Sequence, residues 1–317
     1  MTRAALALGC AQLGNLYRAI DDEHAAAIVD AAWDAGIRYF DTAPHYGLGL
    51  SERRLGAALA GRPRAAYTVS TKVGRVLEPV PGGGAGLDDA GFVVPATHRR
   101  VWDFSRDGVR RSLAESLARL GLDRIDLALL HDPEHRPDQA LAEGYPALRQ
   151  LKDEGVVGAI GIGSMDPAVL ARFVTECAPD EIIVAGRYTL LEQPALDAVL
   201  PACAAAGTVV HNAAIFNSGL LAMDRPHAGL PYEYGPAPAE LVARAGAIAD
   251  VCAAHGTTLP AAALAFAGDH PLVRSVIVGA DSPEQVRRNA ELFAKPPAPE
   301  LWPALVAAGL LDPRALA

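Results

Sequence analysis

The stretch Tyr39–Gly47, with the sequence Tyr-Phe-Asp-Thr-Ala-Pro-His-Tyr-Gly, is an apolar β-prone run that ends in an acid and opens into a loop punctuated by proline and glycine. This order is typical of a buried strand with polar side chains at its carboxyl end. Two later apolar runs end in the same way, with Lys72 after residues 67–71 and His131 after residues 125–130. These runs predict that an acid, a phenol, an amine and an imidazole lie at the carboxyl ends of strands.

Short apolar runs alternate with amphipathic helical segments along the whole chain. The predicted strands are Leu6–Cys10, Arg38–Asp41, Tyr67–Lys72, Ile125–His131, Val157–Ile162, Glu181–Ala185, Thr208–Asn212 and Val273–Val278. Predicted helices between them include Glu23–Ala35, Ser105–Leu120 and Tyr145–Glu154. This alternation predicts an α/β fold, a closed (β/α)8 TIM barrel with long active-face loops, formed by residues 1–317 as a single domain.

A doubly wound open sheet is the alternative architecture. It would need a glycine-rich dinucleotide turn after the first strand, and residues 9–14 carry glycines at the wrong spacing for that turn. Residues 73–103 are interpreted as a loop insertion. Within them, Pro81–Gly86 is interpreted as a mobile flap rather than a phosphate cradle, because it does not lie between a strand and an immediate helix.

The composition argues against several classes of function. A formal net charge of -9 without a basic stripe argues against binding to nucleic acid or to an anionic membrane surface. No apolar run reaches transmembrane length. The four cysteines lie far apart without a CxxC pair, which gives no metal pattern and fits a reducing cytoplasm. We expect a cytoplasmic protein that acts on a small molecule, and its oligomeric state is left open.

The four strand-end residues Asp41, Tyr46, Lys72 and His131 are the candidate catalytic group. In a parallel barrel such residues meet at the active face. Tyr46 can exchange a proton with a substrate oxygen, but its free pKa of about 10 is too high for work near neutrality. We expect the Lys72 ammonium to lower that pKa, Asp41 to hold Lys72 charged, and His131 to hydrogen-bond the substrate oxygen.

With these residues the chain resembles the aldo-keto reductases, (β/α)8-barrel oxidoreductases that use a nicotinamide nucleotide. The resemblance is carried by Gly36–Ala43 with Tyr46-Gly47 and Ser51-Glu52, by Lys72, and by His131-Asp132-Pro133. It implies that Asp41, Tyr46, Lys72 and His131 form a catalytic tetrad, with Tyr46 as the proton donor or acceptor.

Further blocks are similar to a narrower branch of this family, which includes dehydrogenases of L-fucose, D-arabinose and related D-threo-aldoses, and pyridoxal 4-dehydrogenase. The blocks are residues 13–17, 44–52, 101–105, 186–191 and 216–219. Within these blocks, the resemblance implies that Tyr17, His45 and Trp102 contact the substrate.

The same resemblance implies a cofactor site at the ends of the later strands. Tyr188 is expected to stack on the nicotinamide, with a core tyrosine as the alternative. The residues expected near the pyrophosphate are Phe216, Asn217, Ser218, Gly219 and Leu220, with an ordinary turn as the alternative. The residues expected where the adenosine end meets a helix N-terminus are Gly279, Asp281, Gln285 and Asn289.

Met165 departs from the family pattern, because an asparagine is expected there to bind the nicotinamide carboxamide and a thioether cannot replace its hydrogen bonds. Either Ser164 or Asp166 is expected to take over, or the ring is held less tightly. At the adenosine end, Asp281 without a neighbouring cationic pair predicts a preference for NAD over NADP. Arg287 and Arg288 could still reach a 2′-phosphate.

These features together predict an NAD(P)-dependent oxidoreductase that oxidises the anomeric carbon of an aldose to a lactone, or reversibly handles an aldehyde. Pyridoxal oxidation by the same tetrad is an alternative enzyme activity. From another class, the alternative is a barrel that binds nicotinamide as a sensor or regulatory subunit without efficient turnover.

Overall fold

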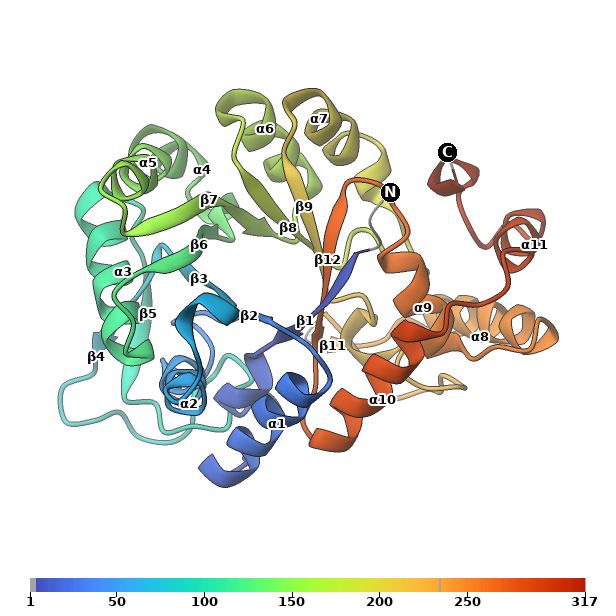
Figure 1. Cartoon of the computed structure of the whole chain (residues 1–317), viewed down its shortest axis with the longest axis horizontal. Coiled ribbons are helices and arrows are strands. Elements are labelled where there is room, and N and C mark those ends of the chain that lie inside the picture. Colours follow the sequence, from blue (N-terminus) through green and yellow to red (C-terminus); the bar gives the residue numbers. More distant parts are fainter. Residues whose placement is uncertain (1–3, 234, 317) are drawn as a thin grey trace.

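The eight apolar runs predicted as strands all form strands, and each pairs in parallel with its two neighbours around a closed barrel (Figure 1). The computed structural model describes residues 4–233 and 235–316. Around the barrel the order is β1-β12-β9-β8-β7-β6-β3-β2. Their bounds are β1 Ala5–Gly9, β2 Tyr39–Asp41, β3 Thr68–Val73, β6 Ile125–His131, β7 Val157–Ser164, β8 Glu181–Ala185, β9 Val209–Ala213 and β12 Val273–Gly279. The predicted TIM barrel is confirmed, and the open doubly wound sheet is excluded.

Helices connect the strands and cover the outside of the barrel (Figure 1). Their bounds are α1 Asp22–Asp34, α2 Leu50–Leu59, α3 Arg106–Leu120, α4 Pro137–Gln139, α5 Tyr145–Asp153, α6 Pro167–Cys177, α7 Val199–Ala206, α8 Ala239–Ala254, α9 Leu259–Ala267, α10 Pro283–Ala294 and α11 Leu301–Ala307. Local signals set several ends. Asp21 accepts a hydrogen bond from the His24 N–H (2.7 Å) before α1, and Gly121 ends α3 with a φ of 65°.

Two layers of apolar side chains build the core. One fills the barrel interior and consists of Ala7, Tyr39, Leu127, Leu129, Ile183 and Ile277. A larger one lies between the strands and the helices. His211 is 2% exposed and bonds to Ser275 Oγ (2.9 Å) and to the Glu181 carboxylate. These contacts agree with a structural role.

The connection after β3 contains a hairpin that sequence reasoning missed. Its strands are β4 Arg75–Pro79 and β5 His98–Trp102, paired antiparallel. The same connection returns to the loop after β1, where the Tyr17 N–H donates to Gly91 O and the Val93 N–H donates to Asn15 O, both at 2.9 Å. The segment thus lies beside strand carboxyl ends. The mobility of its glycine-rich part stays a prediction, as does the single-domain organisation.

A second small hairpin, β10 Pro231–Tyr232 with β11 Gly235–Pro236, precedes α8. Among the residues that the structure describes, no helix is long and apolar enough to cross a membrane.

Candidate active site

The four candidate catalytic residues meet at the carboxyl end of the barrel. Asp41 is the last residue of β2 and His131 the last of β6, while Lys72 lies one residue before the end of β3. Tyr46 lies in the loop between β2 and α2. Because β2, β3 and β6 are neighbours in the barrel order, their ends bring these side chains into one cluster.

Lys72 is at the centre of this cluster. Its Nζ donates to Asp41 Oδ2 (2.7 Å), to Thr42 O (3.0 Å) and to Tyr46 Oη (3.0 Å). These three acceptors use all three N–H groups of the ammonium. Because Tyr46 Oη accepts from Lys72, its own O–H remains free to donate, and no described residue accepts it. The arrangement therefore directs the phenol proton away from Lys72.

A chain of hydroxyl groups orients the Asp41 carboxylate from the opposite side. Ser70 Oγ donates to Asp41 Oδ1 (2.6 Å), and Tyr39 Oη donates to Ser70 Oγ (3.0 Å). Asp41 and Lys72 are each 4% exposed. With one oxygen held by Ser70, the other is available to Lys72.

Burial and charge act in opposite directions on this pair. Burial alone would lower the pKa of Lys72, but the charges of Asp41 and Tyr46 outweigh it and raise that pKa above its ordinary value. For Tyr46, burial raises the pKa to about 12, and the opposing effect of the Lys72 ammonium is smaller. Lys72 does lower the pKa of Tyr46, as expected. The expected net lowering is nevertheless wrong, because desolvation destabilises the phenolate by more than the Lys72 charge stabilises it.

His131 lies beside Tyr46, with ring centroids 6.0 Å apart and planes at 90°. Burial, and then the positive charges of Arg75 and Lys72, hold the pKa of His131 well below its ordinary value. Its Nδ1 is buried and has no hydrogen-bond partner among the described residues. The lowered pKa of His131 favours the neutral imidazole, which offers one N–H donor and one acceptor nitrogen.

The Tyr46 loop is positioned by close contact with the loop after β1. A Cβ atom on Gly14 would lie 2.6 Å from the Tyr46 carbonyl carbon, so only glycine fits there. The Ser51 hydroxyl donates to Cys10 O (2.7 Å) and lies 2.8 Å from Thr42 Oγ1. These contacts join the ends of β1 and β2 to the start of α2.

Two of the residues expected to contact the substrate lie beside this group. His45 is 8% exposed, and burial together with Arg75 and Arg100 lowers its pKa to about 2. Trp102 packs under Arg75, whose guanidinium carbon lies 4.2 Å from the indole centroid. Tyr17 is 54% exposed on the loop after β1.

Arg75 and Asp132 belong to the same region and were missed as site residues. Arg75 donates to Asp132 Oδ2, and its Nη1 lies 3.2 Å from His45 Nδ1. Asp132 follows His131 directly, and its Oδ2 lies 3.5 Å from His131 Nε2. Burial raises the pKa of Asp132 to about 6, and Arg75 opposes that shift. The available signals were the position of Asp132 in the His-Asp-Pro block and that of Arg75 three residues after Lys72.

The candidates for replacing the carboxamide-binding amide already have structural partners. Ser164, at the end of β7, donates to Glu134 Oε2 (2.9 Å) and accepts from the Asp166 N–H (2.9 Å). Asp166 caps α6 by accepting from the N–H groups of Ala168 and Val169. Their role toward nicotinamide stays a prediction. It requires Ser164 or Asp166 to bond to the carboxamide in addition to, or in place of, one of these partners.

Tyr188 is 1% exposed, and its ring stacks on Phe266 with centroids 4.9 Å apart. Burial raises its pKa above the ordinary value. This placement favours the alternative of a core tyrosine. Stacking on nicotinamide, which needs an accessible ring face, remains an untested prediction.

The loop expected near the pyrophosphate forms a short turn after β9, with a 3-10 segment η6 at Asn217–Gly219. Asn217, Ser218 and Gly219 have positive φ angles of 46°, 59° and 102°. Asn217 Oδ1 is buried without a partner among the described residues, while Ser218 Oγ accepts from the Glu233 N–H (3.1 Å). Phe216 is half-buried, and Leu220 is 0% exposed in the core. The N–H groups of Asn217, Gly219 and Leu220 donate to backbone oxygens within the turn, and binding of the pyrophosphate here stays a prediction.

The expected adenosine end lies where β12 leads into α10. Gly279 ends β12, and a Cβ there would lie 2.6 Å from Gln12 Oε1, so the backbone is closely approached. Ser282 caps α10 by accepting from the Gln285 N–H, and Gln285 Oε1 accepts from the Asp281 N–H (2.9 Å). A capped helix N-terminus beside a glycine fits the phosphate or adenosine part of a dinucleotide.

Asp281 has a cationic neighbour that the sequence did not reveal. Arg18 Nη2 lies 3.4 Å from Asp281 Oδ2 and donates to its carbonyl oxygen (3.1 Å). Arg287 pairs instead with Glu284 (2.7 Å) and Arg288 with Asp224 (3.2 Å). Asn289 is half-buried on α10. The loop after β1 thus contributes the nearest cation to the Asp281 carboxylate among the ion pairs of the described residues.

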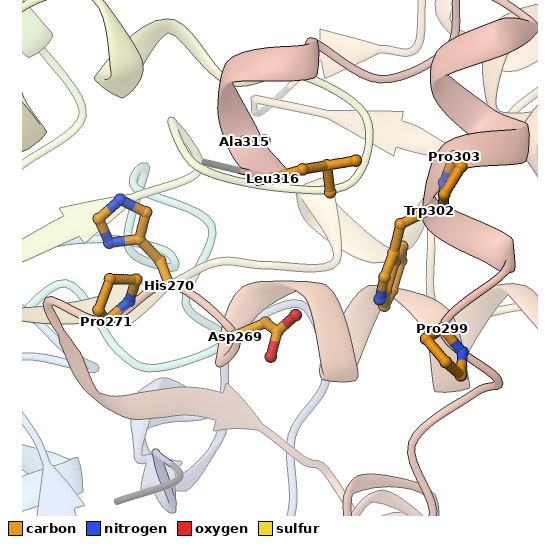
Figure 2. A pocket seen from close by; sticks show the side chains of 8 residues that line it. All are labelled: Asp269, His270, Pro271, Pro299, Trp302, Pro303, Ala315 and Leu316. Atoms are coloured by element: carbon orange, nitrogen blue, oxygen red, sulfur yellow. The ribbon is translucent and has the colours of Figure 1, made fainter. Parts of the chain in front are cut away.

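Two further features lie outside this site. Within residues 4–233 and 235–316, no group of three or more His, Cys, Asp or Glu side chains could hold a metal ion. A pocket of about 280 Å³ is lined by Asp269, His270, Pro271, Pro299, Trp302, Pro303, Ala315 and Leu316 (Figure 2). Its loop 269–271 enters β12 from the amino end, so this pocket is on the side of the barrel opposite the tetrad.

Comparisons with known proteins agree with this geometry. The model of the Aldo/keto reductase family matches residues 5–308. D-threo-aldose 1-dehydrogenase from a Pseudomonas species is 55% identical over 310 residues, which cover 97% of this chain and 94% of the relative. Pyridoxal 4-dehydrogenase from Microbacterium luteolum is 36% identical over 332 residues, covering 98% and 96%.

A solved structure shares the architecture. An aldo-keto reductase from Bacillus halodurans, in its holo form, superposes with a TM-score of 0.78 at 27% identity, covering 98% of this chain and 93% of that structure.

Proposed function

The chain belongs to the aldo/keto reductase family and is an oxidoreductase, and we propose that it is an aldose 1-dehydrogenase. Such an enzyme oxidises the anomeric C1–OH of an aldose, and the product is a lactone. Enzymes of this family use a nicotinamide nucleotide. The observation that carries the proposal is the Lys72 ammonium, which bonds to both Asp41 and Tyr46 beside the neutral His131. The 55% identity to a D-threo-aldose 1-dehydrogenase supports the choice of substrate.

In this proposal Tyr46 moves the proton. When bound, the nicotinamide supplies the acceptor for the hydride that leaves C1 during oxidation. Tyr46, as phenolate, takes the proton from the C1 hydroxyl, so that the oxygen can form the lactone carbonyl. In the reverse direction the neutral phenol donates that proton. Lys72 stabilises the phenolate, and Asp41 keeps Lys72 charged and in place.

His131 positions the reacting oxygen in this proposal. A neutral imidazole has one N–H donor and one acceptor nitrogen, so it can hydrogen-bond the substrate oxygen without competing for its proton. The low pKa of His131 supports this division of labour, because a protonated imidazole would repel Lys72 and Arg75.

The cofactor residues are proposed as a set. Asn217, Ser218 and Gly219 would hold the pyrophosphate, assisted by Phe216 and Leu220 as the frame of the turn. Gly279, Asp281, Gln285 and Asn289 would hold the adenosine end, and Ser164 the carboxamide. The capped start of α10 supports the assignment of the adenosine end.

We also propose that NAD is preferred over NADP. Asp281 can accept a hydrogen bond from a ribose 2′-hydroxyl and would repel a 2′-phosphate. Arg18 offsets part of that repulsion, but its side chain is 58% exposed, so its effect is screened by solvent. We expect kcat/KM for NAD to exceed that for NADP by at least about tenfold, or roughly 1.4 kcal/mol.

A substrate panel tests the function. The panel consists of L-fucose, D-arabinose, pyridoxal and butanal. Oxidation is assayed with NAD or NADP, and reduction of the aldehydes with the reduced cofactors. The fluorescence of the reduced cofactor is followed in each case. Oxidation of an aldose with the highest kcat/KM supports the proposal. Higher kcat/KM for pyridoxal would assign the chain to the activity of its 36%-identical relative instead. Cofactor binding without turnover of any member would contradict both.

A cytoplasmic location is proposed as well. The four cysteines, at positions 10, 177, 203 and 252, are all free thiols, which supports a reducing compartment.

A further inference from the structure

An ion pair outside the tetrad lies directly beside His131. Arg75, the first residue of β4, donates to Asp132, the residue after β6. Three neighbours fix the guanidinium: the Asp132 carboxylate, the His45 ring (3.2 Å from Nη1) and the face of Trp102 (4.2 Å). Asp132 in turn has a positive φ of 44°, a conformation that costs free energy for a residue other than glycine. The fold thus maintains a strained backbone to keep this carboxylate beside His131.

The pair retains unused hydrogen-bonding capacity. A guanidinium has five N–H donors, and here only Asp132 and His45 accept from it. The Nε of Arg75 is buried and has no partner among the described residues. On Asp132 only Oδ2 is bonded, to Arg75, so Oδ1 has no donor within the described part of the chain. The side chains are 14% and 20% exposed, so the pair is neither sealed in the core nor solvated like a surface ion pair.

A guanidinium with unused N–H groups, paired with a carboxylate that has one free oxygen, offers the groups that bind two neighbouring hydroxyls. One hydroxyl oxygen accepts from the guanidinium, and the next hydroxyl donates to the carboxylate. A hydrocarbon chain offers neither group. Because Asp132 Oδ2 lies 3.5 Å from His131 Nε2, such hydroxyls would belong to carbons close to the reacting carbon.

We propose that Arg75 and Asp132 form a subsite that binds two neighbouring hydroxyl groups of the aldose and selects polyhydroxylated substrates over simple aldehydes. This inference rests on the proposed aldose 1-dehydrogenase function and assigns its substrate specificity. Trp102 and His45 act by holding the guanidinium in place. Trp102 therefore contributes through Arg75 rather than as a stacking platform, since Arg75 already covers its ring.

The test compares substrates that differ by one hydroxyl. In L-fucose, any neighbouring pair among the non-reacting ring hydroxyls at C2, C3 and C4 includes the one at C3, so 3-deoxy-L-fucose is the deciding probe. The variants are Arg75→Met, Arg75→Lys and Asp132→Asn. Arg99→Met is the matched control, because Arg99 is on the same hairpin, 71% exposed and paired with Glu78. Circular dichroism and the Kd for NADH check that each variant is folded.

For Arg75→Met we expect kcat/KM on L-fucose to fall about 30-fold, mainly through KM, which corresponds to about 2 kcal/mol. The loss on butanal should be at least about tenfold smaller. The preference of the unmodified enzyme for L-fucose over 3-deoxy-L-fucose should largely disappear in Arg75→Met and Asp132→Asn. Arg75→Lys should lie between, because a lysine keeps the charge without the fork of donors. Arg99→Met should behave like the unmodified enzyme.

Two outcomes overturn the inference while leaving the proposed function intact. Equal losses on L-fucose and butanal would mean that the pair only holds the site together. An unchanged preference for L-fucose over its 3-deoxy form would mean that the hydroxyls bind elsewhere. Failure of the proposed function is seen separately, because the unmodified enzyme would then oxidise no aldose. In that case the inference is refuted as well.

Discussion

Replacing Lys72 with methionine should suppress aldose oxidation much more strongly than aldehyde reduction. Lys72 Nζ lies 3.0 Å from Tyr46 Oη. At an effective dielectric constant of about 20, unit charges at that separation interact by about 5 kcal/mol, or roughly 4 pKa units. Relaxation and water entering the vacated space reduce this effect. We therefore expect the pKa of Tyr46, already raised to about 12, to rise further by at least about 2 units.

The sign of the effect follows from which form of Tyr46 each direction uses. Oxidation needs the phenolate, whose fraction below its pKa falls about tenfold for each unit by which that pKa rises. Oxidation should therefore lose at least about a hundredfold in kcat/KM across the neutral and alkaline range. Reduction uses the neutral phenol, which stays fully populated. Its kcat/KM should fall by a smaller factor, because a phenol with a higher pKa is a weaker proton donor.

The assay is kcat/KM against pH from 7 to 10.5, for L-fucose with NAD and for butanal with NADH. In the unmodified enzyme, oxidation should increase with pH throughout this range, because the pKa of Tyr46 lies above it. Lys152→Met is the control, since it removes another lysine that pairs with an aspartate, Asp180, at 2.6 Å but lies on α5. Its profile should not change.

Removing Lys72 also leaves Asp41 buried without a counter-charge, at a cost of about 3 to 5 kcal/mol of stability. The double substitution of Asp41→Asn with Lys72→Met avoids this cost and tests the same coupling. Equal losses in both directions, or oxidation in a folded variant that is as fast as in the unmodified enzyme from pH 7 to 10.5, would refute the assignment of Lys72 as the group that stabilises the phenolate.

Three more predictions concern single side chains. Tyr46→Phe should lower turnover in both directions by roughly a hundredfold or more with the Kd for NADH nearly unchanged, and retention of most activity would remove Tyr46 from the mechanism. Met165→Asn should tighten nicotinamide binding by about 1 kcal/mol, or roughly fivefold in an NADH titration, whereas no change would mean that Ser164 already holds the carboxamide. Asp281→Ala should reduce the preference for NAD over NADP in steady-state kinetics at low salt, while Arg18→Met, which frees Asp281, should increase it. Equal use of both cofactors by the unmodified enzyme would instead make Arg287 or Arg288 the next residue to replace.

The barrel and the meeting of the candidate catalytic residues at one face could be predicted because both follow from local patterns combined with one geometric rule. The predicted strands Ile125–His131 and Glu181–Ala185 have the observed bounds, and Tyr67–Lys72 is shifted by a single residue. Once eight such strands close in parallel, their carboxyl ends must lie on one face, so Asp41, Lys72 and His131 meet without any knowledge of side-chain packing.

The electrostatics of the tetrad required the structure. Sequence reasoning included the attraction of Lys72 for the Tyr46 phenolate but not the burial that outweighs it, and so the net direction of the pKa was wrong. Burial depends on all the chain segments that cover a group, and these are distant in sequence. The stacking of Tyr188 on Phe266 of α9 likewise could not be read from the sequence, because the two residues are distant along the chain.

The amino-acid sequence alone determined the barrel, the identity of the four candidate catalytic residues and the resemblance to an oxidoreductase family, since each depends on periodicity or on residues close together along the chain. Only the tertiary structure decided that Arg75 pairs with Asp132 beside His131, and that Arg18 pairs with Asp281 across 263 positions of sequence. Such pairs arise when connections between strands fold back over one face of the barrel. Their contacts leave no periodic signal, because each depends on where a whole loop comes to rest.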